Sequence, residues 1–399
     1  MQTKINYEQI KTFFYCLPLY WAISGLFLVD SGDKKLVVLI LLTIPFKLIS
    51  YFKGDKNLNI DILGISLIIF SFISCYIYTT KGYSSSEIRT VLSLTFFYIF
   101  IFNKSNIINH RIMSCVLFIT ASISVYNTYD FVFLSDIGRG YWYINAIPYA
   151  NQLSMLLMFA LFNFTKDTTK TRYLSLLSSG LFLCSIFISD TRGAWVSLFL
   201  CSIIAMIIFR KSLIKDKLLL STIIISTMII LLATKNNISE RLEQTKTEIS
   251  AISKDNLNTS LGIRIQLWSL GLKFIKEDFS LTGYGQKGHL NKIKQLKKHG
   301  KIKGRLARFD SKNFHNDFID RTVKYGLFGL SSLIFFIVFP LKLGFKSKDI
   351  EVKALLIITP LYMISACMSY ISFSYSTNLA TYLIIIMIAT IINRESNRI

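Results

Sequence analysis

Three side chains suited to chemistry on an anionic substrate, Arg192, Arg264 and His315, lie in or beside a long polar stretch of an otherwise apolar chain. A guanidinium binds phosphate oxygens through paired hydrogen bonds and keeps its charge, so Arg192 and Arg264 could hold a diphosphate leaving group. An imidazole of ordinary pKa can accept a proton at neutral pH, so His315 could serve as a general base. The combination predicts an enzyme that works at a membrane face on a negatively charged, lipid-linked substrate.

Each of the three residues also has a structural explanation, which the sequence leaves open. Arg264 could extend to a lipid phosphate at the membrane surface. Arg192 lies in a predicted tight turn, where an ion pair with Asp190 could stabilise the turn. A single loop histidine such as His315 is usually not catalytic.

A basic tract follows in the same stretch, with nine cations and no acid from Lys287 to Arg308. Such a tract would attract a pyrophosphate or the phosphates of a glycolipid, and salt should weaken its contribution. The alternative is a solvated, mobile segment that merely lies near anionic lipid. His289 and His299 lie within the tract and are expected to be solvated. The candidates for substrate binding beyond the reactive trio are Arg139, Lys287, Arg305, Arg308 and Asn316.

The elements that must position these residues are membrane helices, because 52% of the 399 residues are hydrophobic and apolar runs recur at membrane-spanning length. The sequence predicts an all-α polytopic membrane protein with spans at about residues 12–29, 36–52, 60–80, 88–102, 111–134, 149–164, 173–189, 193–209, 217–234, 325–345, 354–372 and 376–392. These twelve spans divide the chain into residues 1–234 with nine spans, residues 235–324 as a long outer loop, and residues 325–399 with three spans.

The predicted loop contains two helices and a turn. A capping-box pattern at Asn237 predicts the start of a helix that ends at about Ser253. A second helix, from about residue 261 to 276, has Arg264 at the edge of an apolar stripe. The stripe consists of Leu261, Ile265, Trp268, Leu272 and Ile275. The sequence GYG at residues 283–285 predicts a flexible turn.

The distribution of Lys and Arg predicts the orientation in the membrane. Most cations of the short loops fall on the side of the termini, so both termini are expected in the cytoplasm and the long loop in the periplasm. The net charge of +22 then reflects topology and anionic lipid or glycolipid partners, and nucleic acid is not expected as a partner. All six cysteines lie in predicted spans, so no disulfide framework is expected, and no Cys/His spacing predicts a metal site.

Ionisable side chains fall only near the ends of the predicted spans. A buried charge inside a span usually marks an ion or proton pathway, so this placement disfavours a proton-coupled transporter or flippase. The sequence YWY at residues 141–143 precedes the sixth span. It predicts an interfacial aromatic belt, with sugar stacking as the alternative.

Short motifs around the long loop resemble signatures of the O-antigen ligase and polymerase superfamily. They are SDTRGAWV at residues 189–196, GIRIQLW at 262–268, LTGYG at 281–285, FHNDF at 314–318 and YGLFGL at 325–330. Their order and their placement around one loop cover about residues 139–330, and among members the chain is most similar to enterobacterial O-antigen ligases. One departure is Asn313, where some ligases are expected to carry a second histidine.

The resemblance implies a GT-C-like glycosyltransferase of the bacterial inner membrane, with its active site facing the periplasm. It would transfer polymerised O-antigen from undecaprenyl diphosphate to lipid A-core, with inversion and without a metal or other cofactor. Arg192 and Arg264 would hold the donor diphosphate, and His315 would deprotonate or orient the acceptor hydroxyl.

Three other functions stay open. A polymerase of the same superfamily would use the same donor and the same leaving group. A non-enzymatic flippase for undecaprenyl-linked sugars would need a cation-lined cavity within the spans, and an oligosaccharyltransferase acting on protein is a weaker option. The basic tract fits phosphorylated lipid A-core better than a second undecaprenyl-linked repeat, which favours the ligase.

Overall fold

The computed structural model describes residues 7–54, 56, 58–102, 107–135, 137–140, 142–215, 235–302, 304–308 and 312–396, and these residues form helices without strands. Seven helices in this part of the chain are long and apolar enough to cross a membrane. They are Gly32–Phe52, Ile62–Thr80, His110–Leu134, Arg192–Arg210, Asp317–Lys346, Ile350–Ser369 and Ser376–Ser396. The chain is therefore an all-helical polytopic membrane protein. The count of twelve spans stays a prediction, and the ninth, residues 217–234, lies outside the described residues.

The helices form two groups, a bundle and a cap. The bundle consists of α1 (Tyr7–Ala22), α2 (Gly25–Leu28), α3 (Gly32–Leu41), α4 (Ile44–Phe52), α5 (Ile62–Thr80), α6 (Ser85–Phe96) with the π-helix η1 (Phe97–Ile101), α7 (His110–Tyr129) with the π-helix η3 (Asp130–Leu134), α8 (Ala146–Lys166), α9 (Arg172–Ile188), α10 (Arg192–Lys215), α16 (Asp317–Lys346), α17 (Ile350–Ser369) and α18 (Ser376–Ser396). The cap consists of α12 (Lys235–Ser253), α13 (Ser260–Glu277), α14 (Gly285–Lys298) and α15 (Gly304–Arg308).

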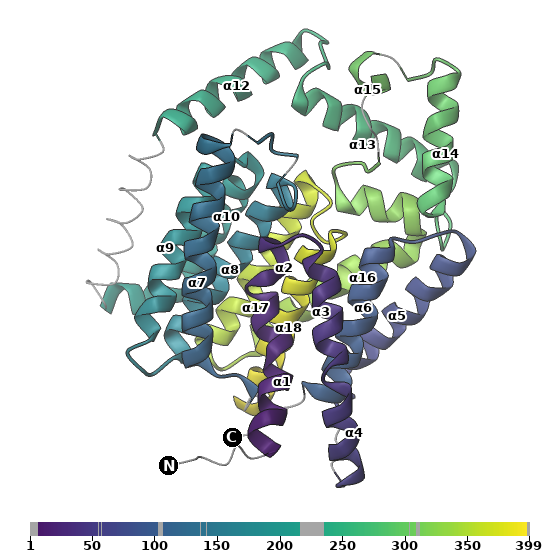
Figure 1. Cartoon of the computed structure of the whole chain (residues 1–399). Coiled ribbons are helices and arrows are strands. Elements are labelled where there is room, and N and C mark those ends of the chain that lie inside the picture. The colour runs from purple at the N-terminus through teal and green to yellow at the C-terminus, as the bar shows by residue number, and fades with distance from the viewer. Residues whose placement is uncertain are drawn as a thin grey trace.

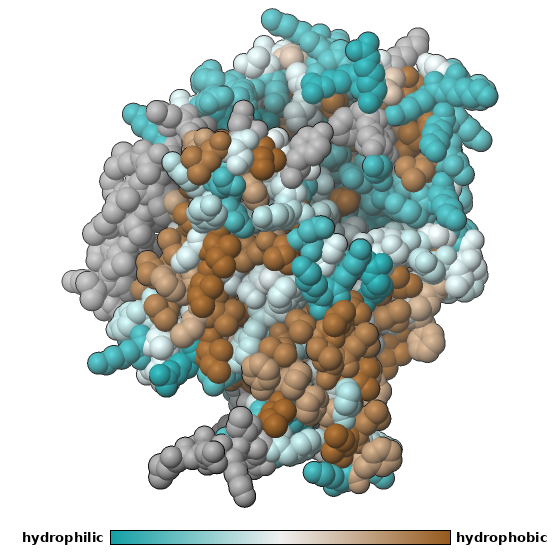
Figure 2. Space-filling model, viewed as in Figure 1, coloured by the Kyte–Doolittle hydropathy of each residue, from teal (hydrophilic) through white to brown (hydrophobic). Residues whose placement is uncertain are grey.

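The cap covers one end of the bundle, and the beginning of α1 and the end of α18 lie at the opposite end (Figure 1). Hydrophobic side chains gather over the flank of the bundle, whereas hydrophilic side chains gather over the cap (Figure 2). An apolar flank between two polar ends is the surface expected of helices that lie among lipid tails.

Helix α18 is the central helix of the bundle. It is apolar on all sides, and 89% of its most apolar stretch of 18 residues is buried. It packs against α6, α8 and α17. A helix that is hydrophobic all round is buried on all sides, so α18 provides the core on which the outer helices assemble.

Helix α13 buries the face opposite to the predicted stripe. Ile263 and Leu267 are buried, whereas Ile265 and Leu272 of the predicted stripe are 41% and 50% exposed. The helix is apolar on two sides, and periodicity cannot tell which side meets a partner. Arg264 lies between the two faces. The predicted start of the preceding helix is also shifted, because α12 already includes Asn237.

The turn at residues 283–285 is anchored, contrary to the expectation of flexibility. The Tyr284 amide donates to the Val323 carbonyl over 2.9 Å, and the Gln286 amide donates to the Gly82 carbonyl over 3.0 Å. Close to this contact, α16 is broken at Gly326, whose backbone is not helical (φ 62°, ψ −150°). The break lies one residue after the predicted start of the tenth span.

A buried ion pair, which the sequence did not predict, joins the beginning of α6 to the beginning of α16. The side chains of Arg321 and Glu87 are both 0% exposed, and their Nη1 and Oε1 atoms are 2.7 Å apart. Arg321 also donates to the Tyr83 hydroxyl over 3.1 Å. The sequence prediction missed this pair because it assigned Arg321 to the loop and Glu87 to the residue before a span. Each charge compensates the other, so the pair does not create an open charged cavity.

Two further aromatic side chains are buried where exposure was expected. Trp142 is 5% exposed and packs edge-on against Tyr149, so it is part of the core and neither an interfacial belt nor a sugar platform. His289 is 0% exposed, although it was expected to be solvated. Its ring nitrogens contact the carbonyls of Gly285 and Lys312 at 3.2 and 3.3 Å. Tyr141 lies outside the described residues, and His299 is exposed as expected.

Candidate active site

Helix α12 crosses the start of α10 and supplies the ion-pair partners of the turn there. Arg192 Nη2 pairs with Glu248 Oε1 at 3.1 Å, and Arg192 Nη1 donates to Thr245 Oγ1 over 2.7 Å. Asp190 pairs with Arg241 of α12, so the considered pair between Asp190 and Arg192 does not form. Arg241, Thr245 and Glu248 follow one another at spacings of four and three, which places them on one face of α12.

Arg139 and Arg264 complete a cluster of arginines around this turn. Arg139 Nη2 donates to Thr191 Oγ1 over 2.8 Å. Burial lowers the pKa of Arg139, and the positive charges of Arg241, Arg192 and Arg264 add to the effect. Burial likewise lowers the pKa of Arg264, and Arg192 lowers it further. The Glu248 carboxylate opposes this shift through its charge, although no hydrogen bond or ion pair to Arg264 is formed within the described part of the chain.

This cluster carries more positive than negative charge. The four guanidiniums face the carboxylates of Asp190 and Glu248, so two formal positive charges are not compensated. The lowered arginine pKa values report the cost of holding these charges close together away from bulk water. Binding of a dianion would offset the repulsion between these charges.

Glu248 connects the two arginines predicted to act together. Its Oε1 atom pairs with Arg192, and its Oε2 atom accepts from the Leu261 amide over 3.1 Å. Leu261 lies in the first turn of α13, three residues before Arg264. One carboxylate therefore fixes α10, α12 and α13 relative to one another.

His315 faces this cluster in a left-handed backbone conformation, with φ of 52°. Histidine adopts positive φ more often than most side chains, but the conformation still needs support. The support comes from Asn313 Oδ1, which accepts from the His315 amide over 3.2 Å, and from Trp268 Nε1, which donates to the His315 carbonyl over 3.4 Å. Asn313, the departure from the ligase motif, thus has a structural role.

The imidazole of His315 is neutral at physiological pH. Burial and the charge of Arg264 lower its pKa to about 4, while Asp320 opposes the shift. The ring of Tyr370, from the connection between α17 and α18, packs edge-on against the His315 ring with 5.2 Å between centroids. Burial raises the pKa of Tyr370 to about 12, so its phenol is neutral as well.

Close helix packing brings these groups together. Gly193, the second residue of α10, lies so near α17 that a β-carbon there would be 2.9 Å from Ser369 Oγ, next to Tyr370. Gly271 of α13 lies so near the start of α16 that a β-carbon would be 2.3 Å from Ile319 Cγ2. Larger side chains at these positions would separate the arginines from His315.

The other residues predicted to bind substrate have different contacts from those of the arginine cluster. Asn316 caps α16, because its Oδ1 accepts from the Ile319 amide over 3.2 Å. Lys287 is exposed and lies beside Gly82, in the connection between α5 and α6. Arg305 and Arg308 line a separate cavity in the cap. Substrate binding by these four side chains stays a prediction.

Sequence reasoning missed three residues of the site, Arg241, Glu248 and Tyr370. The first two lie on a polar helix whose charges have no periodic signal, and only the crossing of α12 over α10 reveals their partners. Tyr370 lies beyond the motifs, in a short connection where an aromatic residue resembles an interfacial one. The prediction did bring out Arg139, Arg192, Arg264 and His315, which the fold gathers.

The comparisons with known proteins agree with the motifs. Residues 177–334 match a protein family described as O-antigen ligase. This region contains Arg192, Arg264 and His315, but neither Arg139 nor Tyr370. A protein of Haemophilus influenzae described as uncharacterized is 28% identical over 223 residues, which are 53% of this chain and 54% of that protein. The chain thus spans about half the length of this relative. The matches do not distinguish a ligase from a polymerase.

Proposed function

We propose that this chain is a membrane glycosyltransferase that transfers a glycan from a polyprenyl diphosphate to an acceptor hydroxyl. The observation that carries the proposal is the arginine cluster, in which two uncompensated positive charges lie beside the neutral imidazole of His315. A sugar linked to a lipid through a diphosphate carries two ionised oxygens, so its charge matches the site. The match of residues 177–334 to the O-antigen ligase family supports sugar transfer from a lipid-linked donor.

In the proposed reaction the acceptor oxygen attacks the anomeric carbon of the donor sugar. The new glycosidic bond forms as the bond from that carbon to the diphosphate oxygen breaks, and the bonding electrons leave with the diphosphate. Arg192 and Arg264 stabilise the negative charge that develops on the leaving group. His315 takes up the proton of the acceptor hydroxyl, a contribution typically worth about 10² to 10⁴ in rate. Attack from the face opposite to the diphosphate inverts the anomeric configuration.

Among transfers of this kind we propose the O-antigen ligase reaction. Polymerised O-antigen would be the glycan, undecaprenyl diphosphate its carrier, and lipid A-core the acceptor, at the periplasmic face of the bacterial inner membrane. The family match supports a lipid-linked glycan donor for this reaction but does not separate it from polymerisation. An acceptor that carries phosphates also suits the cationic cap. The O-antigen polymerase is the alternative, because it would use the same donor and the same leaving-group chemistry.

The test compares lipopolysaccharide and the undecaprenyl-linked pool in a strain that lacks this gene. The strain is complemented with wild type, His315→Ala, Arg192→Ala, Arg264→Ala or His299→Ala, at matched protein level. His299 is exposed at the end of α14 and serves as the control histidine. We expect wild type and His299→Ala to restore capped lipopolysaccharide. The other variants should leave core-only lipopolysaccharide with accumulated lipid-linked polymer.

Other outcomes have distinct meanings. Core capped by single repeats in the deletion strain would indicate a polymerase. Loss of all donor from the outer face of the membrane would indicate a flippase. Normal capping by His315→Ala, Arg192→Ala or Arg264→Ala would remove that residue from the active site.

A further inference from the structure

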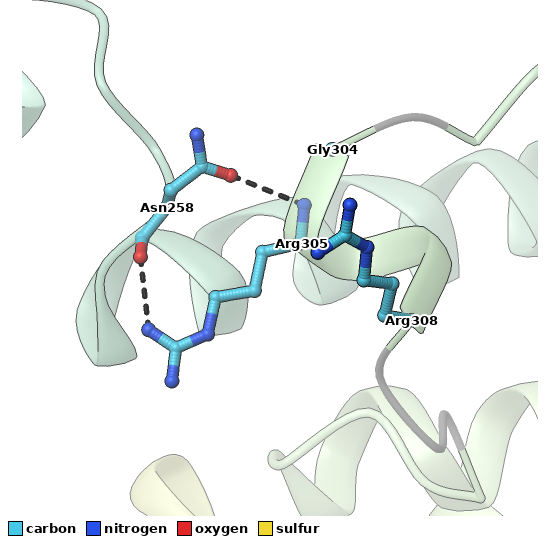
Figure 3. Close-up of a pocket in the computed structure, with 4 residues that line it drawn as sticks. All are labelled: Asn258, Gly304, Arg305 and Arg308. Atoms are coloured by element: carbon cyan, nitrogen blue, oxygen red, sulfur yellow. Dashed lines mark hydrogen bonds between the residues drawn. The ribbon is translucent and has the colours of Figure 1, made fainter.

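A cavity of about 600 Å³ lies in the cap between the start of α13 and the short helix α15. Asn258, Gly304, Arg305 and Arg308 line it (Figure 3). This volume is in the range of pockets that bind small molecules. The cavity is therefore large enough for a phosphate group together with part of the sugar that carries it.

One of the two arginines of the cavity, Arg305, is anchored to the opposite wall. Arg305 Nη1 donates to the Asn258 carbonyl over 2.9 Å, and the Arg305 amide donates to Asn258 Oδ1 over 3.2 Å (Figure 3). The first contact orients the guanidinium through one N–H group, and the second anchors the backbone of α15. Among the ion pairs of the described residues, none includes Arg305 or Arg308.

The cavity is unlike the rest of the basic tract. Lys292 is already paired, with 2.5 Å between its Nζ atom and Glu277 Oε2. Lys294 and Lys298 are exposed on α14 and do not line the cavity. Arg305 and Arg308 are exposed as well, but both line one open pocket at the surface of the cap. Guanidiniums bind phosphate with directed, paired hydrogen bonds, whereas an exposed lysine acts as a point charge.

We propose that this cavity binds a phosphate group carried by the acceptor glycan, an inference that rests on the proposed transferase function. The cavity lies at the end of the molecule that is farthest from the chain termini, above the bundle (Figure 1). This position suits a phosphate on a sugar rather than the headgroup of a bilayer lipid. Arg264 follows Asn258 by six residues, so their Cα atoms are at most about 21 Å apart. A bound phosphate would therefore hold an acceptor oligosaccharide near the arginine cluster.

The experiment measures binding to the full-length protein in an uncharged detergent. The probe is a deacylated, phosphorylated lipopolysaccharide core oligosaccharide, compared with the same oligosaccharide after enzymatic dephosphorylation. One double variant combines Arg305→Gln and Arg308→Gln. The control is a second double variant, Lys294→Gln and Lys298→Gln, which removes the same amount of charge. Loss of charge-assisted hydrogen bonds should weaken binding of the phosphorylated probe at least about tenfold in the arginine variant. The control should lose less than about threefold, as expected for screened surface charges.

Three results would overturn the proposal. Equal loss in both double variants would show diffuse attraction, and equal binding of both probes would show that phosphate is not recognised. Loss of binding to phosphatidylglycerol nanodiscs alone, with no change for the oligosaccharide, would assign the cavity to a lipid headgroup. Because no donor is present, the absence of transfer activity would not alter these binding results. Conversely, if the protein transfers sugar but binds the phosphorylated and dephosphorylated probes equally, the proposed role of the cavity is refuted and the proposed function stands.

Discussion

At the scale of single residues, the electrostatic coupling between Arg264 and His315 links the two halves of the proposed reaction. Burial and then the charge of Arg264 lower the pKa of His315 to about 4, and Arg264 itself feels the carboxylate of Glu248 and the positive charge of Arg192. A base with so low a pKa is neutral but weak. A donor diphosphate bound at Arg264 would offset the guanidinium charge and raise the pKa of His315, so the base would gain strength when the donor arrives.

This coupling predicts different acid limbs for two kinetic parameters. The dependence of kcat/KM on pH reports the free enzyme, so its acid limb should lie near the pKa of about 4 given for His315. The dependence of kcat reports the donor complex, and its acid limb should lie at higher pH. In both cases activity rises with pH, because the imidazole must be unprotonated. The measurement is the rate of glycan transfer by purified protein from pH 4 to 8, at several concentrations of the donor.

Arg264→Gln is the control for the coupling. Removing the cation should raise the pKa of His315 in the free protein and shift the acid limb of kcat/KM upwards, although the rate itself falls. Two observations together would show that Arg264 and His315 are not coupled. The acid limbs of kcat and kcat/KM would coincide in wild type, and the acid limb of kcat/KM would stay at the same pH in Arg264→Gln.

At the scale of elements, the contact between α13 and α16 sets the distance between the donor arginine and the base. Gly271→Ala would place a methyl group 2.3 Å from Ile319 Cγ2 and 3.0 Å from the ring of Phe314, next to His315. Overpacking of this kind costs about 1–3 kcal/mol. We expect a lower unfolding temperature together with a loss of kcat on the order of tenfold or more, because displaced catalytic groups lose rate steeply.

Gly180→Ala provides the matched control, since Gly180 lies within α9 and has no atom within 4 Å of an added β-carbon. It should leave transfer unchanged and slightly raise stability, as alanine favours a helix. The measurements are thermal unfolding in detergent and steady-state transfer for both variants. Full activity in Gly271→Ala would mean that the spacing of α13 and α16 does not control the site.

The helices illustrate what the sequence could predict. Hydropathy located the ends of α17 and α18 to within a few residues, because a span needs a long apolar run. Periodicity could not show which face of α13 is buried, because both faces are apolar and the contact with α16 decides. The residues of the site divide in the same way. Arg192, Arg264 and His315 could be proposed from their chemistry and from the resemblance, but the ion pairs of Asp190 and Glu248 depend on the path of α12, which no local pattern specifies.

At the scale of the whole molecule, the candidate site lies at one end of the bundle only. The cap, the arginine cluster and the cavity share one end, and the termini lie at the other (Figure 1). The connection between α8 and α9 belongs to the end with the termini, because Lys166 pairs there with Asp349, which precedes α17, at 2.5 Å. The proposed reaction requires the cap end to face the periplasm, where a flipped, lipid-linked donor is available.

This requirement predicts the accessibility of single cysteines introduced at the two ends. Lys254→Cys, between α12 and α13, should react with a membrane-impermeant maleimide in intact cells whose outer membrane has been permeabilised. Lys170→Cys, between α8 and α9, should react only after lysis. Both lysines are exposed, and none of the six native cysteines is, so background labelling should be low. Labelling in the reverse order would place the arginine cluster in the cytoplasm, where the donor would have to be used before it crosses the membrane, and would exclude the proposed ligase reaction.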